Sequence, residues 1–329
     1  SRGGRPVPVA RAATRGLSGA TTTGHRARPY RSPAAAAGAR AAHLPPPRTG
    51  HATRTGISLC LPYAACVAYV FDTDTRVTGL ADGRYAVEIT DRWNALGNVP
   101  NGGYLLAICL RALAEEMPYP DPLTVSANYL RPGVVGPAEV HTRIARVGRR
   151  IATGEATLVC QGKETVRVVA SFADLDQATG RTTLLGEPPK LPAPEKLPEL
   201  MDGRTLPGLT VVDRVDYRFT EPLGWMLGRP SGEPSWEFWM RFKDGRPADP
   251  LSLSFFVDAM APTVLDLGEL GSTTVQLTVY LRGRPAPGWL ACRVGTRYLT
   301  GGFHEEDMEI WDSTGTLVAQ SRQLALVLG

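Results

Sequence analysis

The chain has 329 residues, of which 43% are hydrophobic and 21% charged, as in a globular protein with room for two domains. Its net charge of +4 is unevenly distributed, because residues 1–70 contain ten Arg and no acidic residue, whereas the remainder has 26 Lys and Arg against 32 Asp and Glu. The mildly acidic body gives no support to nucleic-acid binding, so no nucleic-acid partner is expected.

Residues 1–68 are rich in Arg, Ala, Gly, Pro and Thr, with too few large apolar side chains to build a core. We predict a disordered or poorly ordered extension here. An over-extended reading frame and an Arg-rich transit peptide are the alternatives. The uncharged run 55–71 contains Pro62 and is shorter than the roughly 20 residues of a spanning helix, so no membrane span is expected.

The five cysteines form no CxxC pair, which is typical of reduced thiols in a cytoplasmic protein and not of a disulfide framework or a zinc site. No spacing of His, Cys and carboxylates suggests a metal, and no motif suggests a cofactor.

From residue 69 onwards the pattern changes to strands and two long helical stretches. Residues 84–90 alternate as a strand, and residues 98–116 predict a helix that begins at Asn101 and two glycines. Four more strands follow, separated by turns with Gly or Pro: 123–131, 138–148, 152–162 and 165–173. Residues 177–209 contain six prolines and no clear periodicity, which predicts an extended linker.

The second half repeats this order. Residues 235–242 predict a strand and 251–268 a helix, and these strands follow: 273–283, 288–301, 303–315 and 316–329. "YLRPGVVGPAEV" at 129–140 echoes "YLRGRPAPGWLA" at 280–291, an offset of 151 residues that indicates a duplicated domain. A strand, a long apolar helix and an antiparallel meander are the element order of the hotdog fold. We therefore predict an α+β double hotdog, with hotdog domains at 69–176 and 210–329.

One residue, Asp258, is out of place in the apolar run "LSLSFFVDAMAPTVLDLG". A helical wheel places these residues on one apolar stripe: Leu253, Phe256, Val257, Met260, Val264 and Leu267. Asp258 lies on the other face, between Ser254 and Ala261, and the helix is apolar enough nearly all round to be buried. Burying an ionised carboxylate costs several kcal/mol unless donors compensate it, so this carboxylate is a candidate catalytic base.

Two alternatives remain open for Asp258. It would be structural if it only accepted hydrogen bonds from neighbouring backbone amides, or if Pro262 broke the helix nearby. Asp266, near the end of the same predicted helix, is expected to face solvent.

Four stretches resemble one known family: "DRWNALGNVPNGGYLLAICLRA", "DPLTVSANYLRPGVVGPAEV", "FFVDAMAP" and "GTLVAQSRQ". Residues 69–329 resemble the acyl-CoA thioesterase II (TesB-type) family of double hotdogs. The resemblance implies a catalytic set of Asp258, Thr274 and Gln323, with Thr273 in place of Thr274 if the match slips by one residue. In "TTVQLTVYLR", Gln276 and Leu277 replace an acidic residue and a His of many relatives, a departure that bears on substrate choice.

The implied activity is hydrolysis of an acyl-CoA thioester by water. Asp258 would deprotonate the water, while Thr274 and Gln323 hold it in register. Backbone N–H groups at Gly102 and Gly103, where a helix begins, would stabilise the oxyanion. Alternatively, the two glycines serve only the turn into the helix.

Competing functions have less support. A hotdog dehydratase would need a catalytic His in a helix, whereas His141 and His304 are on predicted strands and the other three histidines are in the extension. No Gly-x-Ser-x-Gly elbow occurs, so a serine hydrolase is unsupported. The second hypothesis is a hotdog that binds acyl-CoA or another apolar ligand without turning it over. Free sheet edges or faces would also be compatible with a homo-oligomer.

Overall fold

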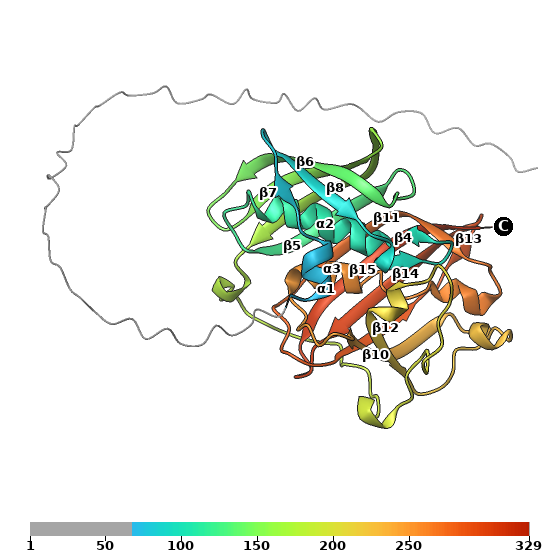
Figure 1. The fold of residues 1–329 in the computed structure, drawn as a ribbon. Coiled ribbons are helices and arrows are strands. Elements are labelled where there is room, and N and C mark those ends of the chain that lie inside the picture. Colours follow the sequence, from blue (N-terminus) through green and yellow to red (C-terminus); the bar gives the residue numbers. More distant parts are fainter. Residues whose placement is uncertain (1–67, 329) are drawn as a thin grey trace, which may run out of the picture. The chain divides into compact units, whose positions relative to one another are not determined.

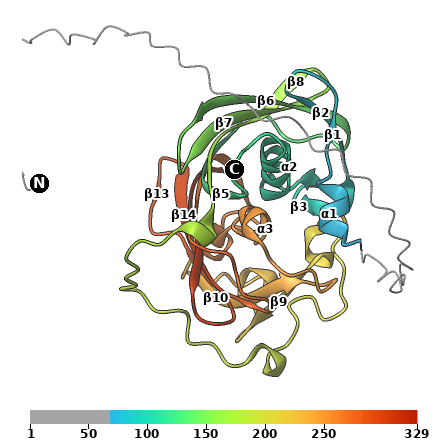
Figure 2. The same cartoon turned by 90° about the vertical axis from the view of Figure 1, so that its left-hand side faces the viewer.

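A single curved antiparallel sheet dominates residues 68–328, the residues that the computed structural model describes (Figure 1). The predicted extension therefore lies outside the described residues, apart from residue 68. The 13-stranded sheet curves around two helices, α2 (Gly102–Ala114) and α3 (Pro250–Phe256), which lie side by side against its concave face (Figure 2). Every strand predicted from the alternation is present, except that the strand predicted over 288–301 is divided into β12 and β13.

The remaining elements have the following bounds: α1 Val70–Asp74, β1 Thr78–Gly79, β2 Arg84–Ile89, β3 Asn94–Ala95, β4 Val99–Pro100, β5 Asp121–Tyr129, β6 Gly136–Val147, β7 Ala152–Cys160, β8 Lys163–Ala173, β9 Val215–Phe219, β10 Ser235–Phe242, β11 Ser272–Leu281, β12 Leu290–Gly295, β13 Leu299–Thr300, β14 Phe303–Trp311 and β15 Leu317–Val327. The helix α1, the short strands β1, β3 and β4, and the edge strand β9 were not predicted.

The order of the strands is nearly symmetric about the centre of the sheet. It runs β1-β2-β6-β7-β8-β5-β11-β15-β14-β12-β10-β9, with β13 beside β14. In the first half, β2 comes before α2 and lies far from the centre, while β5 comes after α2 and lies at the centre. In the second half, β10 and β11 have the same relation to α3. The two halves of the chain therefore fold with the same local topology.

The sequence repeat coincides with this centre. An offset of 151 residues relates Ser126 to Leu277 and Ala127 to Thr278. In the β5–β11 ladder Ser126 lies opposite Thr278, and Ala127 lies opposite Leu277. The two halves consequently join edge to edge, through backbone hydrogen bonds between equivalent strands.

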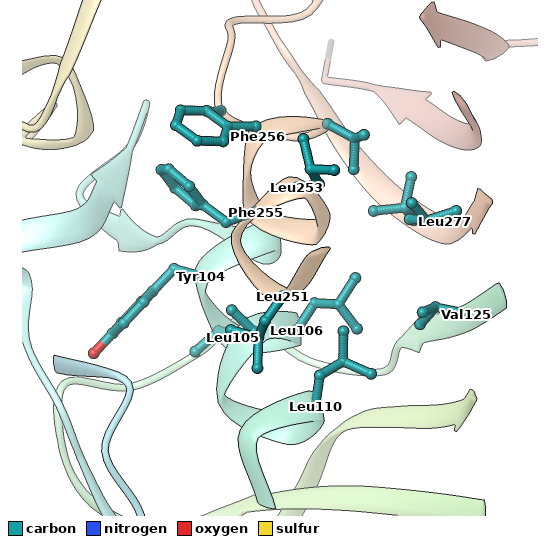
Figure 3. Close-up of a cluster of buried hydrophobic side chains, with 14 of the residues drawn as sticks. Tyr104, Leu105, Leu106, Leu110, Val125, Leu251, Leu253, Phe255, Phe256 and Leu277 are labelled. Carbon is teal, nitrogen blue, oxygen red and sulfur yellow. The ribbon is translucent and has the colours of Figure 1, made fainter. Parts of the chain in front are cut away.

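The two helices bury a shared apolar cluster beneath the central strands (Figure 3). The close-up shows leucines of α2 next to residues of α3, with Val125 of β5 and Leu277 of β11 facing them. Each of these two strand residues is at most 1% exposed. Full burial of one such side chain stabilises a fold by roughly 1.5–3 kcal/mol, so this cluster fixes the position of α3 against α2.

The helix predicted over 251–268 is wrong in extent. Asp249 caps α3 in a capping box with Ser252, and the helix ends at Phe256. A continuing helix would need the N–H of residue 262 for the carbonyl of Asp258, but Pro262 has no N–H. Instead, the Asn101 side-chain amide donates to that carbonyl at 2.7 Å. Asp258 therefore lies in a turn just after the helix, so the break near Pro262 is confirmed, whereas the structural role that this alternative attached to Asp258 is tested by the Asp258→Asn variant.

Beyond this turn, a 3₁₀ helix at Thr263–Leu267 also departs from the predicted helical wheel. Leu267 is 40% exposed, although it was placed on the buried stripe. Asp266 is 2% exposed, so its predicted solvent-facing position is wrong. One of its oxygens accepts the N–H groups of Trp225 and Ser231, and the other accepts the indole N–H of Trp236 at 2.7 Å. The prediction failed because the α-helical period does not apply once the helix has ended.

Asp266→Ala should be strongly destabilising, because it leaves buried donors without an acceptor. Unsatisfied buried groups cost about 1–3 kcal/mol each, so the thermal midpoint should fall by on the order of 5–10 °C. Thermal denaturation followed by circular dichroism measures this. The exposed Asp213→Ala, which removes the same charge, is the control, and equal midpoints for the two variants would contradict a structural role for Asp266.

Among residues 68–328, no helix is both long enough and apolar enough to cross a membrane. Cys109, Cys160 and Cys292 are buried free thiols, while Cys60 and Cys66 lie outside the described residues.

Candidate active site

The carboxylate of Asp258 lies at the N-terminus of α2. Its Oδ2 accepts the backbone N–H of Gly103 at 2.7 Å and the side-chain amide of Asn101 at 3.2 Å. The same Asn101 caps α2, since its Oδ1 accepts the N–H of Tyr104. Among the described residues no donor contacts Oδ1 of Asp258, so that oxygen keeps its lone pairs available. The two halves of the chain thus build this site together.

Burial raises the pKa of Asp258 from its ordinary value of 3.8 to about 7. The loss of solvation is the largest cause, and the nearby negative charge of Glu306 adds to it, whereas the hydrogen bonds from Gly103 and Asn101 oppose it. The residue as a whole keeps some solvent exposure. A carboxylate with a pKa near 7 is well matched to accept a proton at neutral pH.

The two glycines permit the close approach of α2 to this carboxylate. A Cβ on Gly102 would lie 2.9 Å from Oδ2 of Asp258, and a Cβ on Gly103 would lie 2.7 Å from the carbonyl oxygen of Phe255. A side chain at Gly103 would separate α2 from α3, and one at Gly102 would collide with the Asp258 carboxylate and the ring of Tyr129. The N–H of Gly103 is engaged by Asp258 in this structure, and the oxyanion role of the two glycines stays a prediction.

Thr274 and Gln323 are brought together on neighbouring strands. The Thr274 hydroxyl donates to Oε1 of Gln323 at 2.9 Å, from β11 to β15. Gln323 is 7% exposed, and Thr274 lies at a β-bulge between Thr274 and Gln276. A bulge re-aims a side chain out of strict alternation. Thr273 is exposed and Thr274 makes the contact, so the pairing favours Thr274 over the one-residue slip.

Asp258 is not hydrogen-bonded to either of these two residues. The connection runs through Glu306 of β14, whose Oε1 accepts the Gln323 amide at 2.9 Å. Its Oε2 accepts the N–H of Thr263 at 2.6 Å and the Thr263 hydroxyl at 2.9 Å. Glu306 also acts on Asp258 through its charge. One buried carboxylate that the sequence analysis did not single out is therefore hydrogen-bonded to Gln323 and acts on Asp258 through its charge, while Thr274 is linked to it only through Gln323.

A signal for Glu306 was present in the sequence. In "FHEEDMEIW" the alternation of β14 places Glu306 on the same face as Met308 and Ile310, which are at most 3% exposed. A carboxylate on an apolar strand face is the same anomaly that drew attention to Asp258.

Tyr129, at the end of β5, is a second unpredicted neighbour. A Cβ added to Gly102 would lie 2.9 Å from Oδ2 of Asp258 and 3.1 Å from Cζ of Tyr129. Because both atoms are near this one position, the tyrosine ring lies close to the carboxylate. Its hydroxyl is buried and has no hydrogen-bond partner among the described residues. Burial first, and the charge of Asp258 second, raise its pKa well above the usual range, so the phenol remains a neutral donor.

Two surface clefts lie away from these residues. The larger, of about 430 Å³, is at the other end of the helix pair, and Arg111, Asp249 and Arg284 are among its lining residues. The smaller, of about 250 Å³, is lined by residues that include Trp93 and Phe242. Neither Asp258 nor Thr274 nor Gln323 lines either cleft.

Comparison with known proteins assigns the two halves separately. Residues 89–173 match the model of the acyl-CoA thioesterase N-terminal domain, and residues 188–327 match that of the acyl-CoA thioesterase C-terminal domain. The chain belongs to the acyl-CoA thioesterase family, and it is a thioester hydrolase.

Among solved structures, it is similar to a thioesterase II from Thermobifida fusca, at 30% identity and a TM-score of 0.72 over 79% of this chain and 98% of that one. An acyl-CoA thioesterase II from Mycobacterium marinum shares the fold, at 20% identity and a TM-score of 0.61 over 78% of this chain and 98% of that one. An uncharacterized protein of Mycobacterium tuberculosis is 29% identical over 265 residues, or 73% of this chain and 89% of that protein.

Proposed function

We propose that the protein hydrolyses an acyl-CoA thioester to a free acid and CoA, with Asp258 as the general base and Thr274 and Gln323 as the groups that position the attacking water. The observation that carries this proposal is the Asp258 carboxylate, whose pKa is about 7 and whose Oδ1 is free of donors among residues 68–328. The hydrogen-bonded pair of Thr274 and Gln323 supports it.

The chemistry requires little beyond these groups. A thioester carbonyl is electrophilic enough for attack by a water that is oriented and partly deprotonated. Asp258 takes one proton of the water, and the water oxygen bonds to the carbonyl carbon. The carbon–sulfur bond then breaks as Asp258 gives that proton to the sulfur, so that CoA leaves as a thiol and the carboxylate is regenerated. General-base assistance contributes typically 10²–10⁴-fold, and orientation of the water contributes further.

We propose further that the fold is a tandem double hotdog, with domains at 69–176 and 210–329 and a linker at 177–209. The nearly symmetric strand order and the central β5–β11 pair support this division. In such an arrangement one active site needs both domains. Here Asp258 comes from the second half, while its donors Asn101 and Gly103 come from the first.

The test is hydrolysis of a panel of acyl-CoAs of increasing chain length by the purified protein, with thiol release followed directly. At least one member should be turned over, and kcat should rise with pH to a plateau above a midpoint near 7, because only ionised Asp258 accepts a proton. Binding of acyl-CoAs without thiol release would instead identify a non-catalytic binding protein. A pH midpoint near 4 would contradict the environment of Asp258.

A further inference from the structure

Beyond its effect on the pKa of Asp258, the buried carboxylate of Glu306 has no assigned role in the proposed hydrolysis. It is 6% exposed, and both of its oxygens are used as acceptors. On one side it accepts the amide of Gln323, and on the other it is fixed by the N–H and hydroxyl of Thr263. A buried charge is costly, so its retention next to the proposed site calls for a reason in the reaction.

A glutamine amide can be turned by 180° at little intrinsic cost, since its oxygen and nitrogen have nearly the same shape. An ionised carboxylate, in contrast, can only accept. Glu306 therefore forces Nε2 of Gln323 toward itself, at 2.9 Å, and turns Oε1 toward Thr274. In the opposite orientation, two oxygens would face each other without a proton between them.

The orientation of Gln323 in turn decides the direction of the Thr274 hydroxyl. Its single hydrogen is donated to Oε1 of Gln323, so its oxygen is left as an acceptor. In the proposed reaction, a water bound there would donate one hydrogen to Thr274 and the other to Asp258. Both hydrogens are then anchored, and a lone pair on the water oxygen is free to attack the carbonyl carbon. If the Thr274 hydroxyl pointed at the water instead, it would occupy one of the two lone pairs of the water oxygen and leave one water hydrogen without this acceptor.

We propose that Glu306 is a positioning residue for the hydrolysis, which sets the Gln323 amide and, through it, the hydroxyl of Thr274. This inference rests on the proposed function of the site. In the proposed arrangement, the Gln323 amide donates to Glu306, the Thr274 hydroxyl donates to Gln323, and the nucleophilic water donates to Thr274.

Glu306→Gln is the primary variant, because it keeps the shape of the side chain and removes only the acceptor-only character and the charge. The new amide keeps its oxygen toward the N–H of Thr263 and presents its NH2 to Gln323, which favours the reversed orientation of the Gln323 amide. The kcat should therefore fall by roughly 10–100-fold, as for loss of an orienting group, while KM stays near the wild-type value. Glu309→Gln, on the same strand and paired with Arg293, removes an equal charge at a distance and should leave kcat unchanged.

The pH profile gives a readout that a purely structural role would not move. Loss of the Glu306 charge should shift the acid limb of kcat to lower pH, because that charge raises the pKa of Asp258. Burial also raises the pKa of Glu306 itself, and the hydrogen bonds from Thr263 and Gln323 oppose this rise. The other titratable groups that act on or face this pair are Tyr129 of β5 and Tyr217 of β9, both neutral near pH 7, and Asp307, which neighbours Glu306 and is paired with Arg322. Buried His304 of β14 is linked to Glu306 through Thr296 and Thr263, and burial lowers its pKa, so it is neutral there as well. None of them changes charge near pH 7.

The route of action is tested by combining Glu306→Gln with Thr274→Ala. If Glu306 works through Thr274, adding Glu306→Gln to the Thr274→Ala variant should lower kcat by less than threefold. An equal loss in both backgrounds, or an unchanged kcat in Glu306→Gln alone, would overturn the proposal.

An exchange variant, Glu306→Gln with Gln323→Glu, keeps an acceptor opposite Thr274 and should exceed Gln323→Glu alone in kcat. This variant replaces Glu306→Gln as the test if Glu306→Gln has a much lower thermal midpoint than the wild type. A kcat of the exchange variant no higher than that of Gln323→Glu would also overturn the proposal. Wild-type turnover and its loss in Asp258→Asn report separately on the proposed function.

Discussion

Asp258→Asn should lower kcat for acyl-CoA hydrolysis by about 10²–10⁴-fold, the contribution typical of a general base. Asparagine keeps the shape of the side chain but offers no basic lone pair to the water. It can still accept the N–H of Gly103, so the local geometry should survive. Binding of a non-hydrolysable acyl-CoA analogue should therefore stay near the wild-type affinity, as measured by calorimetry.

The same variant should be more stable than the wild type at neutral and higher pH. The folded-state pKa of Asp258 is about 7 and its ordinary value is 3.8, so the native state holds a proton that the unfolded chain releases between these values. The contribution of this group to stability is therefore full below about pH 4 and is lost as the pH rises to about 7. The variant should gain on the order of 2–4 kcal/mol over the wild type across this interval, seen in urea denaturation at several pH values.

One result would count against Asp258 as the base. Full turnover in Asp258→Asn together with early unfolding would make the carboxylate structural. Thr274→Ala and Gln323→Ala provide the comparison, since each should cost less than Asp258→Asn. The three changes combined should cost far less than the product of the separate losses, because groups that act as one unit are not additive.

Gly103→Ala should be the second most damaging change, although it adds only one methyl group. The new Cβ would lie 2.7 Å from the carbonyl oxygen of Phe255 and 3.0 Å from Cβ of Asp258, and backbone cannot rotate away as a side chain can. The N-terminus of α2 must then move away from α3, and the hydrogen bond from residue 103 to Asp258 lengthens or breaks.

Overpacking of this kind costs typically 1–3 kcal/mol, and a displacement of about 1 Å at a reacting group can cost 10²-fold in rate. Both the thermal midpoint and kcat should fall, and the acid limb of the pH profile should move to higher pH, because a donor that lowers the pKa of Asp258 is lost. Gly283→Ala is the matched control, since no atom lies within 4 Å of its missing Cβ. Equal behaviour of the two variants would show that the contact of α2 with Asp258 is unimportant.

Local pattern predicted most of the fold. Alternation located the principal strands to within a few residues because each has one face on the core and the other toward solvent, as in β7, where buried and partly exposed residues alternate over nine positions. Asn101, followed by apolar residues at helical spacing, located α2 because capping and the helical period are both local properties. The edge strand β9 was missed, since its run "VDYRF" contains two charged residues and is too short to establish a period.

The sequence predicted some residues of the candidate site and missed others. Asp258 was conspicuous because a carboxylate in an apolar run is rare, and Thr274 and Gln323 came from the family resemblance. Glu306 was missed although it shows the same anomaly on a strand, and Tyr129 has no distinguishing signal, since tyrosine is common at strand ends. The position of Asp266 was predicted wrongly because a helical wheel was extended past the point where Pro262 makes a helix impossible.

The sequence by itself determined the principal strands, the helix α2, the 151-residue repeat and a carboxylate in an apolar setting, because each can be read from short stretches of the chain. Only the tertiary structure decided which groups meet that carboxylate. Asn101 and Gly103 lie more than 150 residues from Asp258, and they reach it because the ladder between β5 and β11 joins the two halves. The end of α3 at Phe256 also depends on a distant residue. The carbonyl of Asp258, which Pro262 leaves without a helical donor, accepts the side-chain amide of Asn101 at 2.7 Å, and only folding brings these two residues together.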